Sequence, residues 1–421
     1  RSNPIVDQKL VMAHVYAHND FFKNNSYFAH TNRNMIDQMA KNASQVRSII
    51  DQEGENTVEI FIDCCLSLEN LIDIHPRIKS HKKNVFKSDK SEMELNSIGR
   101  FPSKPHLESF VNPPDVIKNE IQYQQMQNNK PIQFPEEPQR DILQFLLDHA
   151  PLKGWQHDIL EIIREEACYF APQGQTKIIN EGWASYWHST IMTRHCLDSS
   201  EIIDYADRHS GAMASPDGQL NPYKLGIELL RDIEMRWNLG QFGKEWEECD
   251  DRDKHAKWNL NTGLGQKKLF ETRRIHNDIT LIDEFLTPEF CHRHKLFSFG
   301  LNEDTATYEV ESREFPMIKK RLLFSLTNFG QPVIHVIDGN YLNLSELYLQ
   351  HKTIGSLGLR MDYAQIALEN LHKIWQKPVH IETMDGESPI LLSFDGISHR
   401  ETSLNSDLPK AEPQKIYRRD G

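Results

Sequence analysis

Two histidines near the start of the chain, His14 and His18, stand four residues apart. On an α-helix, side chains at positions i and i+4 project from the same face, so two imidazoles at this spacing can bind one divalent metal ion. A carboxylate from a second helix can complete such a set and leave one coordination position for water. Glu181, within the string Asn-Glu-Gly-Trp-Ala, is the candidate for this third ligand. The sequence therefore predicts a site for zinc, or a similar divalent ion, formed by His14, His18 and Glu181.

Three further side chains could do chemistry beside such a metal. Glu166 lies on the apolar stripe of its expected helix, and Glu165 stands next to it as a substitute. A carboxylate near a metal-bound water is the natural general base. His188 follows Glu181 by seven residues on the same helix face, where it could be a fourth ligand or an acid that holds a substrate carbonyl. We predict these three as the catalytic residues.

The same residues also have a purely structural interpretation. The two N-terminal histidines could be core residues that are hydrogen-bonded to their neighbours, and His188 could simply pack. Their shared inward face favours the metal, because a buried imidazole without a partner is costly. Glu181 could instead form a buried ion pair with one of three arginines, Arg194, Arg231 or Arg236.

The position between the paired histidines is the weak point of a peptidase interpretation. Zinc peptidases of the common kind carry their catalytic base there, as H-E-x-x-H. Here Val15 occupies that position and cannot act as a base. The base would have to be Glu165 or Glu166, or the chemistry differs. With two histidines and two or three inward glutamates, a dinuclear iron or manganese site in a helical bundle is an alternative.

Two other groupings carry weaker signals. Asp207, His209 and Ser210 are close in sequence, but adjacency does not make a catalytic triad. Asn277 or Asp278 is explained most simply as the N-cap of a helix.

Long helices must position these side chains, and apolar residues recur at helical spacing over most of the first 290 residues. His14 and His18 fall on the apolar stripe of the first helix. The further helices expected in this part are 33–51, 58–74, 141–149, 155–170, 176–196, 199–208, 222–238 and 265–286.

After about residue 295 the pattern changes to short alternating strands interrupted by helices. Strands are expected at 296–301, 307–311, 332–338, 379–383 and 389–394, with helices at 316–328 and 363–375 and a turn at Asp338-Gly339.

The fold class that follows is mainly α, with a small α+β domain at the C-terminal end. A polar stretch at 76–138, interrupted by several prolines, predicts a long insertion or linker within the helical part. The expected divisions are a helical domain at 1–294, an α+β domain at 295–398 and a polar tail at 399–421.

Composition limits the function classes. The 421 residues carry a formal net charge of -13, which argues against nucleic-acid binding because that needs Lys and Arg to neutralise phosphates. No run of eighteen apolar residues occurs, so no membrane insertion is expected, and no signal peptide is recognised. Six cysteines without a C-x-x-C pair favour a reducing compartment, which predicts a cytoplasmic protein.

Several long strings make the chain resemble the SpoVR family, named for stage V sporulation protein R. The resemblance implies a link to the spore cortex, a modified peptidoglycan, in a family that also occurs in bacteria that do not sporulate. It implies a missing N-terminal segment as well, which agrees with a start at Arg1 without methionine. The resembling strings include MAHVYAHNDFFKNN, FAHTNRNMID, LSLENLID, KIINEGWASYWHSTIMT, DYADRHSG, NPYKLGIELLRDIE and HNDITLIDEFLT.

A second, partial resemblance concerns the string around Glu181. Asn-Glu-Gly-Trp-Ala is similar to the N-E-G-F-A string of gluzincin aminopeptidases, in which the glutamate ligates zinc. There, as here, it follows the helix with two histidines, although the separation is longer in this chain. This resemblance implies a zincin-like helical body.

The function expected from the sequence is that of a metal-dependent hydrolase, a zinc peptidase or amidase without the usual H-E-x-x-H glutamate. Its substrate would contain an amide bond, in a peptide or a peptidoglycan-related molecule, and it would act in spore cortex formation or a related stress process. The alternatives are a non-catalytic scaffold or regulatory protein of sporulation with protein partners, and a dinuclear oxidase-like protein.

Overall fold

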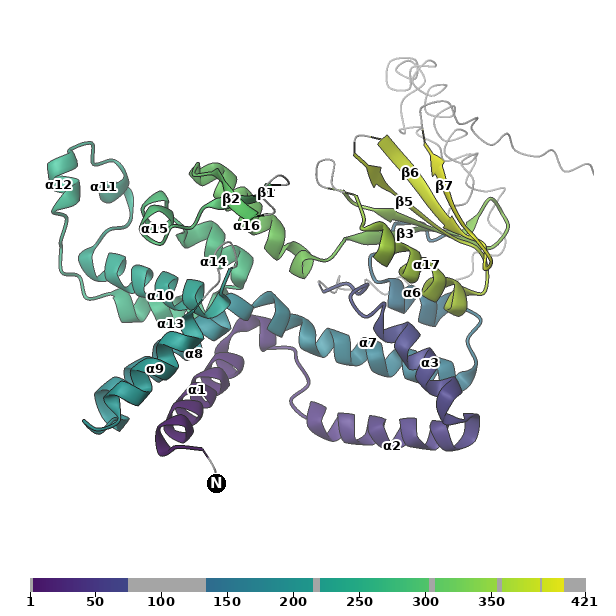
Figure 1. The fold of residues 1–421 in the computed structure, drawn as a ribbon, viewed down its shortest axis with the longest axis horizontal. Helices are drawn as coiled ribbons and strands as arrows, with labels where there is room; N and C mark the ends of the chain where they lie inside the picture. The colour runs from purple at the N-terminus through teal and green to yellow at the C-terminus, as the bar shows by residue number, and fades with distance from the viewer. Residues whose placement is uncertain are drawn as a thin grey trace, which may run out of the picture. The chain divides into compact units, whose positions relative to one another are not determined.

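The chain forms two compact units, each assembled from two stretches of sequence (Figure 1). Unit 1 consists of Arg1–Val58 and Glu161–Pro332, and unit 2 of Glu59–Leu160 and Val333–Gly421. The division expected from the sequence, with a boundary after residue 294, stays a prediction about independent folding. The computed structural model describes residues 3–74, 134–214, 220–302, 307–353, 358–386 and 388–404.

Most of the expected polar insertion, at 76–138, lies outside the described residues. The same holds for most of the expected polar tail, from residue 405 onward. The first part of that tail is described, and it is not irregular: residues 399–403 form a strand.

Unit 1 is mainly helical, as predicted. No helix in the described part of the chain is both long and apolar enough to cross a lipid bilayer. Two helices, α3 (Glu55–Leu66) and α7 (Gly154–Gln175), contribute residues to both units. The other helical elements are α1 (Ile5–Asn24), η1 (Ser26–Phe28), α2 (Met35–Glu53), α8 (Lys177–Ile191), the π-helix η2 (Met192–Cys196), α9 (Ile202–Met213), α10 (Pro222–Leu239), α11 (Lys244–Glu247), α12 (Arg252–Ala256), α13 (Gly265–Ile275), α14 (Asp278–Phe285), α15 (Pro288–Arg293), α16 (Phe315–Leu326) and η3 (Thr327–Gly330).

Local capping explains where several of these helices begin and end. The single helix expected at 265–286 is two helices, because Asn277 forms a capping box with Thr280 and starts α14. The N-cap prediction for this position is thus confirmed at Asn277. Helix α10 begins after Asn221, whose side chain accepts two backbone N–H groups, and ends at Gly240 in the left-handed conformation.

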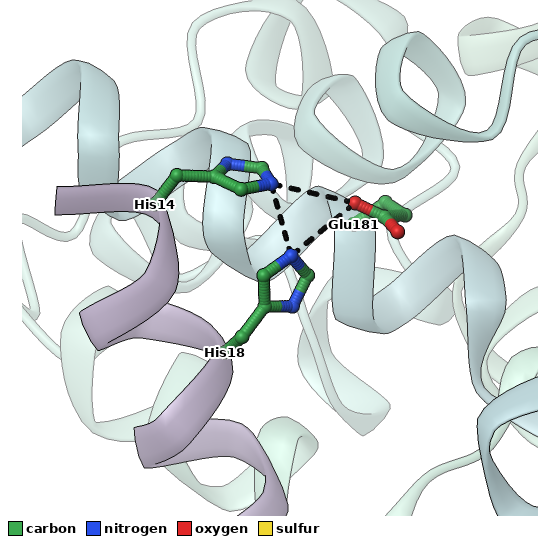
Figure 2. Close-up of side chains that lie close together, drawn as sticks. All are labelled: His14, His18 and Glu181. Atoms are coloured by element: carbon green, nitrogen blue, oxygen red, sulfur yellow. Dashed lines mark hydrogen bonds and ion pairs between the residues drawn. The ribbon is translucent and has the colours of Figure 1, made fainter. Parts of the chain in front are cut away.

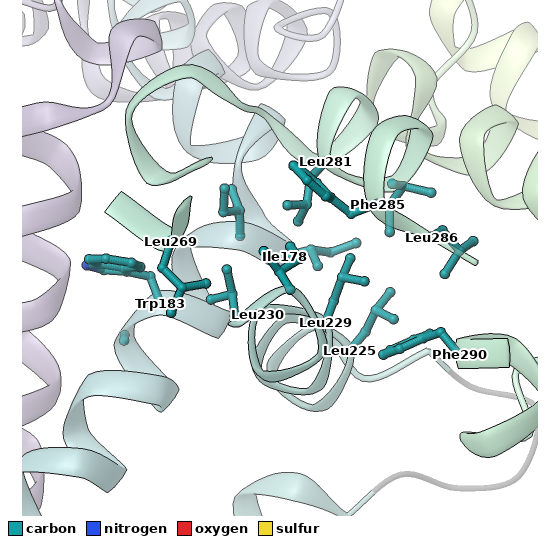
Figure 3. Close-up of a cluster of buried hydrophobic side chains, with 14 of the residues drawn as sticks. Ile178, Trp183, Leu225, Leu229, Leu230, Leu269, Leu281, Phe285, Leu286 and Phe290 are labelled. Atoms are coloured by element: carbon teal, nitrogen blue, oxygen red, sulfur yellow. The ribbon is translucent and has the colours of Figure 1, made fainter. Parts of the chain in front are cut away.

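The core of unit 1 lies between α8, α10, α13 and α14 (Figure 3). Helix α1 joins it through Ala17 and Phe21, which are buried. A short antiparallel hairpin of β1 (Ser298–Asn302) and β2 (Thr307–Ser312) follows α15. The core side chains include Ile178, Trp183, Leu225, Leu229, Leu230, Leu269, Leu281, Phe285, Leu286 and Phe290.

Unit 2 contains a five-stranded sheet in the order β3-β4-β5-β6-β7. All neighbouring pairs are antiparallel except β4 and β5, which are parallel and are joined by α17 (Met361–Trp375), as a parallel pair requires a crossover. Helix α6 (Ile142–His149) packs on β3. The strands are β3 (Ile334–Tyr341), β4 (Glu346–His351), β5 (Val379–Asp385), β6 (Ser388–Phe394) and β7 (His399–Ser403).

Two sequence predictions for this sheet are wrong. Asp338 and Gly339 do not form a turn but lie within β3, where the register with β4 shifts. The true turn comes at 342–345, where Leu342, Asn343 and Ser345 take positive φ values. Strand β4 was not predicted, because the turn residues 342–345 contain no glycine or proline to mark a hairpin.

Helices α8 and α10 cross at two glycines. A Cβ atom on Gly182 would lie 2.5 Å from the carbonyl carbon of Gly226, and one on Gly226 would lie 2.2 Å from the carbonyl oxygen of Ile178. Both distances are to backbone atoms, which cannot rotate away. The crossing therefore requires glycine at both positions.

We expect Gly182→Ala and Gly226→Ala each to lower the free energy of unfolding by about 1–3 kcal/mol or more, because the added methyl forces the helices apart. Gly211→Ala in α9 is the matched control, since no atom lies within 4 Å of its added Cβ and it should be neutral or slightly stabilising. Chemical denaturation of the three variants measures the effect. Equal stability of all three would show that the crossing is not tight.

Candidate metal centre

The three residues predicted as metal ligands come together in unit 1. Figure 2 shows the rings of His14 and His18, one turn apart on α1, pointing toward the carboxylate of Glu181 on α8. The Nε2 atoms of His14 and His18 are 2.9 Å apart. Oε2 of Glu181 lies 3.6 Å from Nε2 of His14 and 3.5 Å from Nε2 of His18. Their ligand atoms form one group within 4.8 Å, and all three residues are half-buried.

The spacing of these atoms fits a bound divalent ion. A tetrahedral zinc with bonds of about 2.0–2.1 Å places its ligand atoms about 3.4 Å apart, close to the observed 2.9–3.6 Å. Oε2 of Glu181 is buried and has no hydrogen-bond partner. An anionic oxygen in that state is costly unless a cation compensates it, so the donor set matches the ion in charge as well as in distance.

His18 is oriented by Asn180, the residue before Glu181. Its Nδ1 lies 2.9 Å from Oδ1 of Asn180, an amide oxygen that can only accept. Nδ1 therefore carries a proton, and in the neutral ring the lone pair on Nε2 faces the group. Partners of this kind fix the tautomer of metal-ligating histidines. Asn180 is not among the residues predicted for the site, although it opens the string that contains Glu181.

His188 lies behind His14. Its Nδ1 is 3.1 Å from Nδ1 of His14, and its Nε2 is 3.2 Å from Nδ1 of His209 on α9. Burial, reinforced by the neighbouring rings, lowers the pKa of His188 to about 3, so this ring is neutral near pH 7. Both of its nitrogens face other rings, which leaves neither free for a metal or a substrate. The sequence assigns no role to His209, because only the packing of α9 brings it next to His188.

The carboxylate of Glu181 is ionised in this group. Burial raises the pKa of Glu181, but the imidazoles of His14 and His18, whose Nε2 atoms lie 3.6 and 3.5 Å from its Oε2, outweigh burial and lower that pKa to about 2. Tyr223, at the start of α10, stacks on His14 with ring centroids 6.4 Å apart. Burial and then the negative charge of Glu181 raise the pKa of Tyr223, so its hydroxyl stays protonated beside the carboxylate.

None of the three arginines considered as structural partners of Glu181 forms an ion pair with it among the described contacts. Arg231 pairs with Glu228 at 2.9 Å, and Arg236 pairs with Asp232 at 2.7 Å. The third, Arg194, is exposed on η2. Among the described residues, the ionisable groups that pair with Glu181 are the imidazoles of His14 and His18, as the predicted ligand set requires.

The predicted bases do not enter the group. Glu165 is exposed and Glu166 half-buried on α7, and neither contributes a ligand atom within 4.8 Å of the three residues. Val15, between the histidines, is 48% exposed. The assignment of the base to Glu165 or Glu166 stays a prediction.

Polar contacts hold α8 and α1 in place around the site. Asp278 accepts hydrogen bonds from the backbone N–H groups of Ile178 and Ile179, at 2.8 and 2.9 Å, and thereby caps the first turn of α8. Trp183 donates its indole N–H to Asp20 on α1 at 3.1 Å, and Arg273 pairs with the same carboxylate oxygen at 2.6 Å. Burial raises the pKa of Asp278 to about 7, in opposition to the backbone donors.

Comparison with known proteins identifies the family of this chain. The family model described as SpoVR like protein matches residues 1–331, a range that includes every residue of the group. This chain belongs to the SpoVR family. Membership suggests a role related to sporulation. The chain is also 26% identical over 415 residues to the Uncharacterized protein YcgB of Escherichia coli (strain K12), covering 93% of this chain and 76% of that relative. No solved structure matches the chain significantly.

We expect Asp278→Ala to lower the free energy of unfolding by about 1–3 kcal/mol, because two buried N–H groups of α8 lose their acceptor. Asp283→Ala in the same helix is the control, since that exposed side chain pairs with Lys319 at the surface and should cost no more than about 1 kcal/mol. Thermal and urea unfolding measure both. A loss for Asp278→Ala no larger than for Asp283→Ala would contradict a capping role.

Proposed function

We propose that this SpoVR-family protein is a metal-dependent hydrolase that cleaves an amide bond, in a peptide or a peptidoglycan-related substrate. His14, His18 and Glu181 would hold the ion, most simply zinc. The observation that carries the proposal is the convergence of three ligand atoms from α1 and α8, with a buried carboxylate oxygen that has no hydrogen-bond partner.

The donor set favours catalysis over a structural role. Two histidines and one glutamate are the ligands of catalytic zinc in thermolysin-type enzymes, whereas structural zinc sites are mostly closed by cysteines. Bound zinc supplies a Lewis acid and lowers the pKa of a coordinated water. A zincin-like helical body is part of this proposal, supported by the similarity of the string at 180–184 to that of gluzincins.

The residues of the chain would divide the remaining tasks. Asn180 holds the ring of His18 so that its Nε2 faces the ion. Tyr223 offers a protonated hydroxyl beside Glu181, suited to donate a hydrogen bond to a substrate oxygen. Glu166, or Glu165 beside it, would take the proton of the attacking water. A movement of α7 or the binding of substrate would have to bring this carboxylate to the water. His188 would act through His14.

The two alternatives fit the geometry less well. Dinuclear sites in helical bundles draw on four glutamates and two histidines. Among the residues that the structure describes, the group at His14 contains a single carboxylate, which favours one ion. In a scaffold with merely structural histidines, only the imidazoles of His14 and His18, at 3.6 and 3.5 Å, would compensate the charge of the buried Oε2 of Glu181. Family membership suggests a role related to sporulation. The proposed hydrolase would act in spore cortex formation or a related stress process.

We expect the purified protein to bind about one zinc ion per chain, and both His14→Ala and Glu181→Ala to lose it. His195→Ala, at an exposed position on η2, is the matched control and should keep its zinc. Elemental analysis after dialysis and chelator competition provide the measurement. Zinc content equal to wild type in both ligand variants would overturn the metal site.

We expect the zinc-loaded protein to release new amino groups from peptides or peptidoglycan fragments, and chelation to stop this release. If the predicted base is correct, Glu166→Gln or Glu165→Gln should lower kcat by about 100-fold or more with zinc content unchanged. Glu245→Gln, at an exposed position on α11, serves as the control. A hydrolase whose rate is unaffected by either substitution would keep the metal site and refute the assigned base.

A further inference from the structure

A chain of three histidine rings leads from the candidate ligand His14 to the outer helix α9. Nδ1 of His14 lies 3.1 Å from Nδ1 of His188, and Nε2 of His188 lies 3.2 Å from Nδ1 of His209. The three rings come from α1, α8 and α9. His209 is half-buried and stacks on Tyr205, with centroids 5.7 Å apart and an angle of 16° between the rings. This stacking orients the ring of His209, the outermost of the three histidines.

When the three rings are neutral, the two hydrogen bonds between them can be directed in only two ways. A neutral imidazole has one N–H donor and one acceptor, so donation at one contact fixes the direction at the next. In the outward arrangement, His14 donates from Nδ1 to His188, and His188 donates from Nε2 to His209. In the inward arrangement, Nδ1 of His209 donates to His188, and Nδ1 of His188 donates to His14.

The two arrangements differ at the metal site. In the outward arrangement Nε2 of His14 keeps its lone pair, directed at the group with Glu181. In the inward arrangement Nε2 of His14 carries the proton and donates a hydrogen bond to Nε2 of His18, 2.9 Å away. Nε2 of the neutral His18 ring is an acceptor because the contact with Asn180 places the proton of that ring on Nδ1. The hydrogen bond between the Nε2 atoms of His14 and His18 therefore has to break when both nitrogens bind an ion.

We propose that His188 and His209 are positioning residues that set the tautomer of His14, and that metal binding reverses the direction of hydrogen bonding along the whole chain. The proposal rests on the metal site of the proposed function and adds to it a role for two residues that touch no ion. On binding, one proton leaves Nε2 of His14. One proton passes from His188 to His14 and one from His209 to His188, while Nε2 of His209 takes up a proton from solvent, so every ring stays neutral.

The first test compares two substitutions of similar size at His209. Oδ1 of His209→Asn can stand near the position of Nδ1 and accept the hydrogen bond from His188, whereas His209→Leu cannot. Loss of an outer partner of a ligating histidine costs about 10–100-fold in metal affinity. We expect His209→Leu to weaken zinc binding by about tenfold, His209→Asn to restore most of it, and the exposed His195→Leu to behave as wild type. Chelator competition on the full chain gives the affinities.

The outcomes separate this inference from the proposed function. Wild-type affinity in His209→Leu, with binding abolished in His14→Ala, overturns the role of the histidine chain and leaves the metal site standing. Absence of zinc binding by the wild type overturns the metal site itself. Equal weakening in His209→Leu and His209→Asn shows a packing effect and also overturns the inference.

The second test needs no variant. Ring ¹⁵N chemical shifts in NMR spectra distinguish a protonated nitrogen from one that carries a lone pair. We expect the proton of His209 to lie on Nδ1 without zinc and on Nε2 with zinc, and the proton of His14 to move from Nε2 to Nδ1. An unchanged tautomer of His209 on addition of zinc contradicts the reversal.

Discussion

The crossing of α8 and α10 leaves no space for a side chain at Gly182 or Gly226, and the candidate site depends on it. Because the two backbones touch, α8 has one position relative to the core of unit 1. Its first turn is fixed again by the carboxylate of Asp278. Asn180 and Glu181 lie within one turn of Gly182 on this helix, so their directions are set by backbone packing and not by flexible loops.

The string at 180–184 can be explained residue by residue. Asn180 orients His18, and Glu181 supplies the carboxylate. Gly182 permits the helix crossing. Trp183 is fully buried in the core and donates a hydrogen bond to Asp20 on α1. A short string thus specifies a ligand, its neighbour's orientation and the packing of two helices, which is why it carries more information than the i, i+4 histidine pair alone.

Sequence patterns predicted the parts of the site that depend on helical periodicity. The spacing of His14 and His18, and the inward face of Glu181, follow from positions along single helices. The role of His209 does not, because it depends on how α9 packs against α8. The same limit explains the errors in the sheet, where Asp338-Gly339 reads as a turn locally but is held within β3 by pairing with β4. Helix content and the C-terminal α+β part were predictable, whereas contacts that depend on how helices pack, such as that between His188 and His209, were not.

The two halves of the metal group are far apart in the chain, and this has a consequence for how the protein folds. His18 and Asn180, the residue before Glu181, are separated by 162 residues, and α1 belongs to the first stretch of a unit whose second stretch begins only at Glu161. Helix α1 can dock only after α8 and α10, which lie later in the sequence, have formed the surface that receives it. Closing so long a loop costs conformational entropy before any contact compensates it. In the proposed site, an ion held by α1 and α8 would offset part of that cost, which would couple the folding of unit 1 to metal binding.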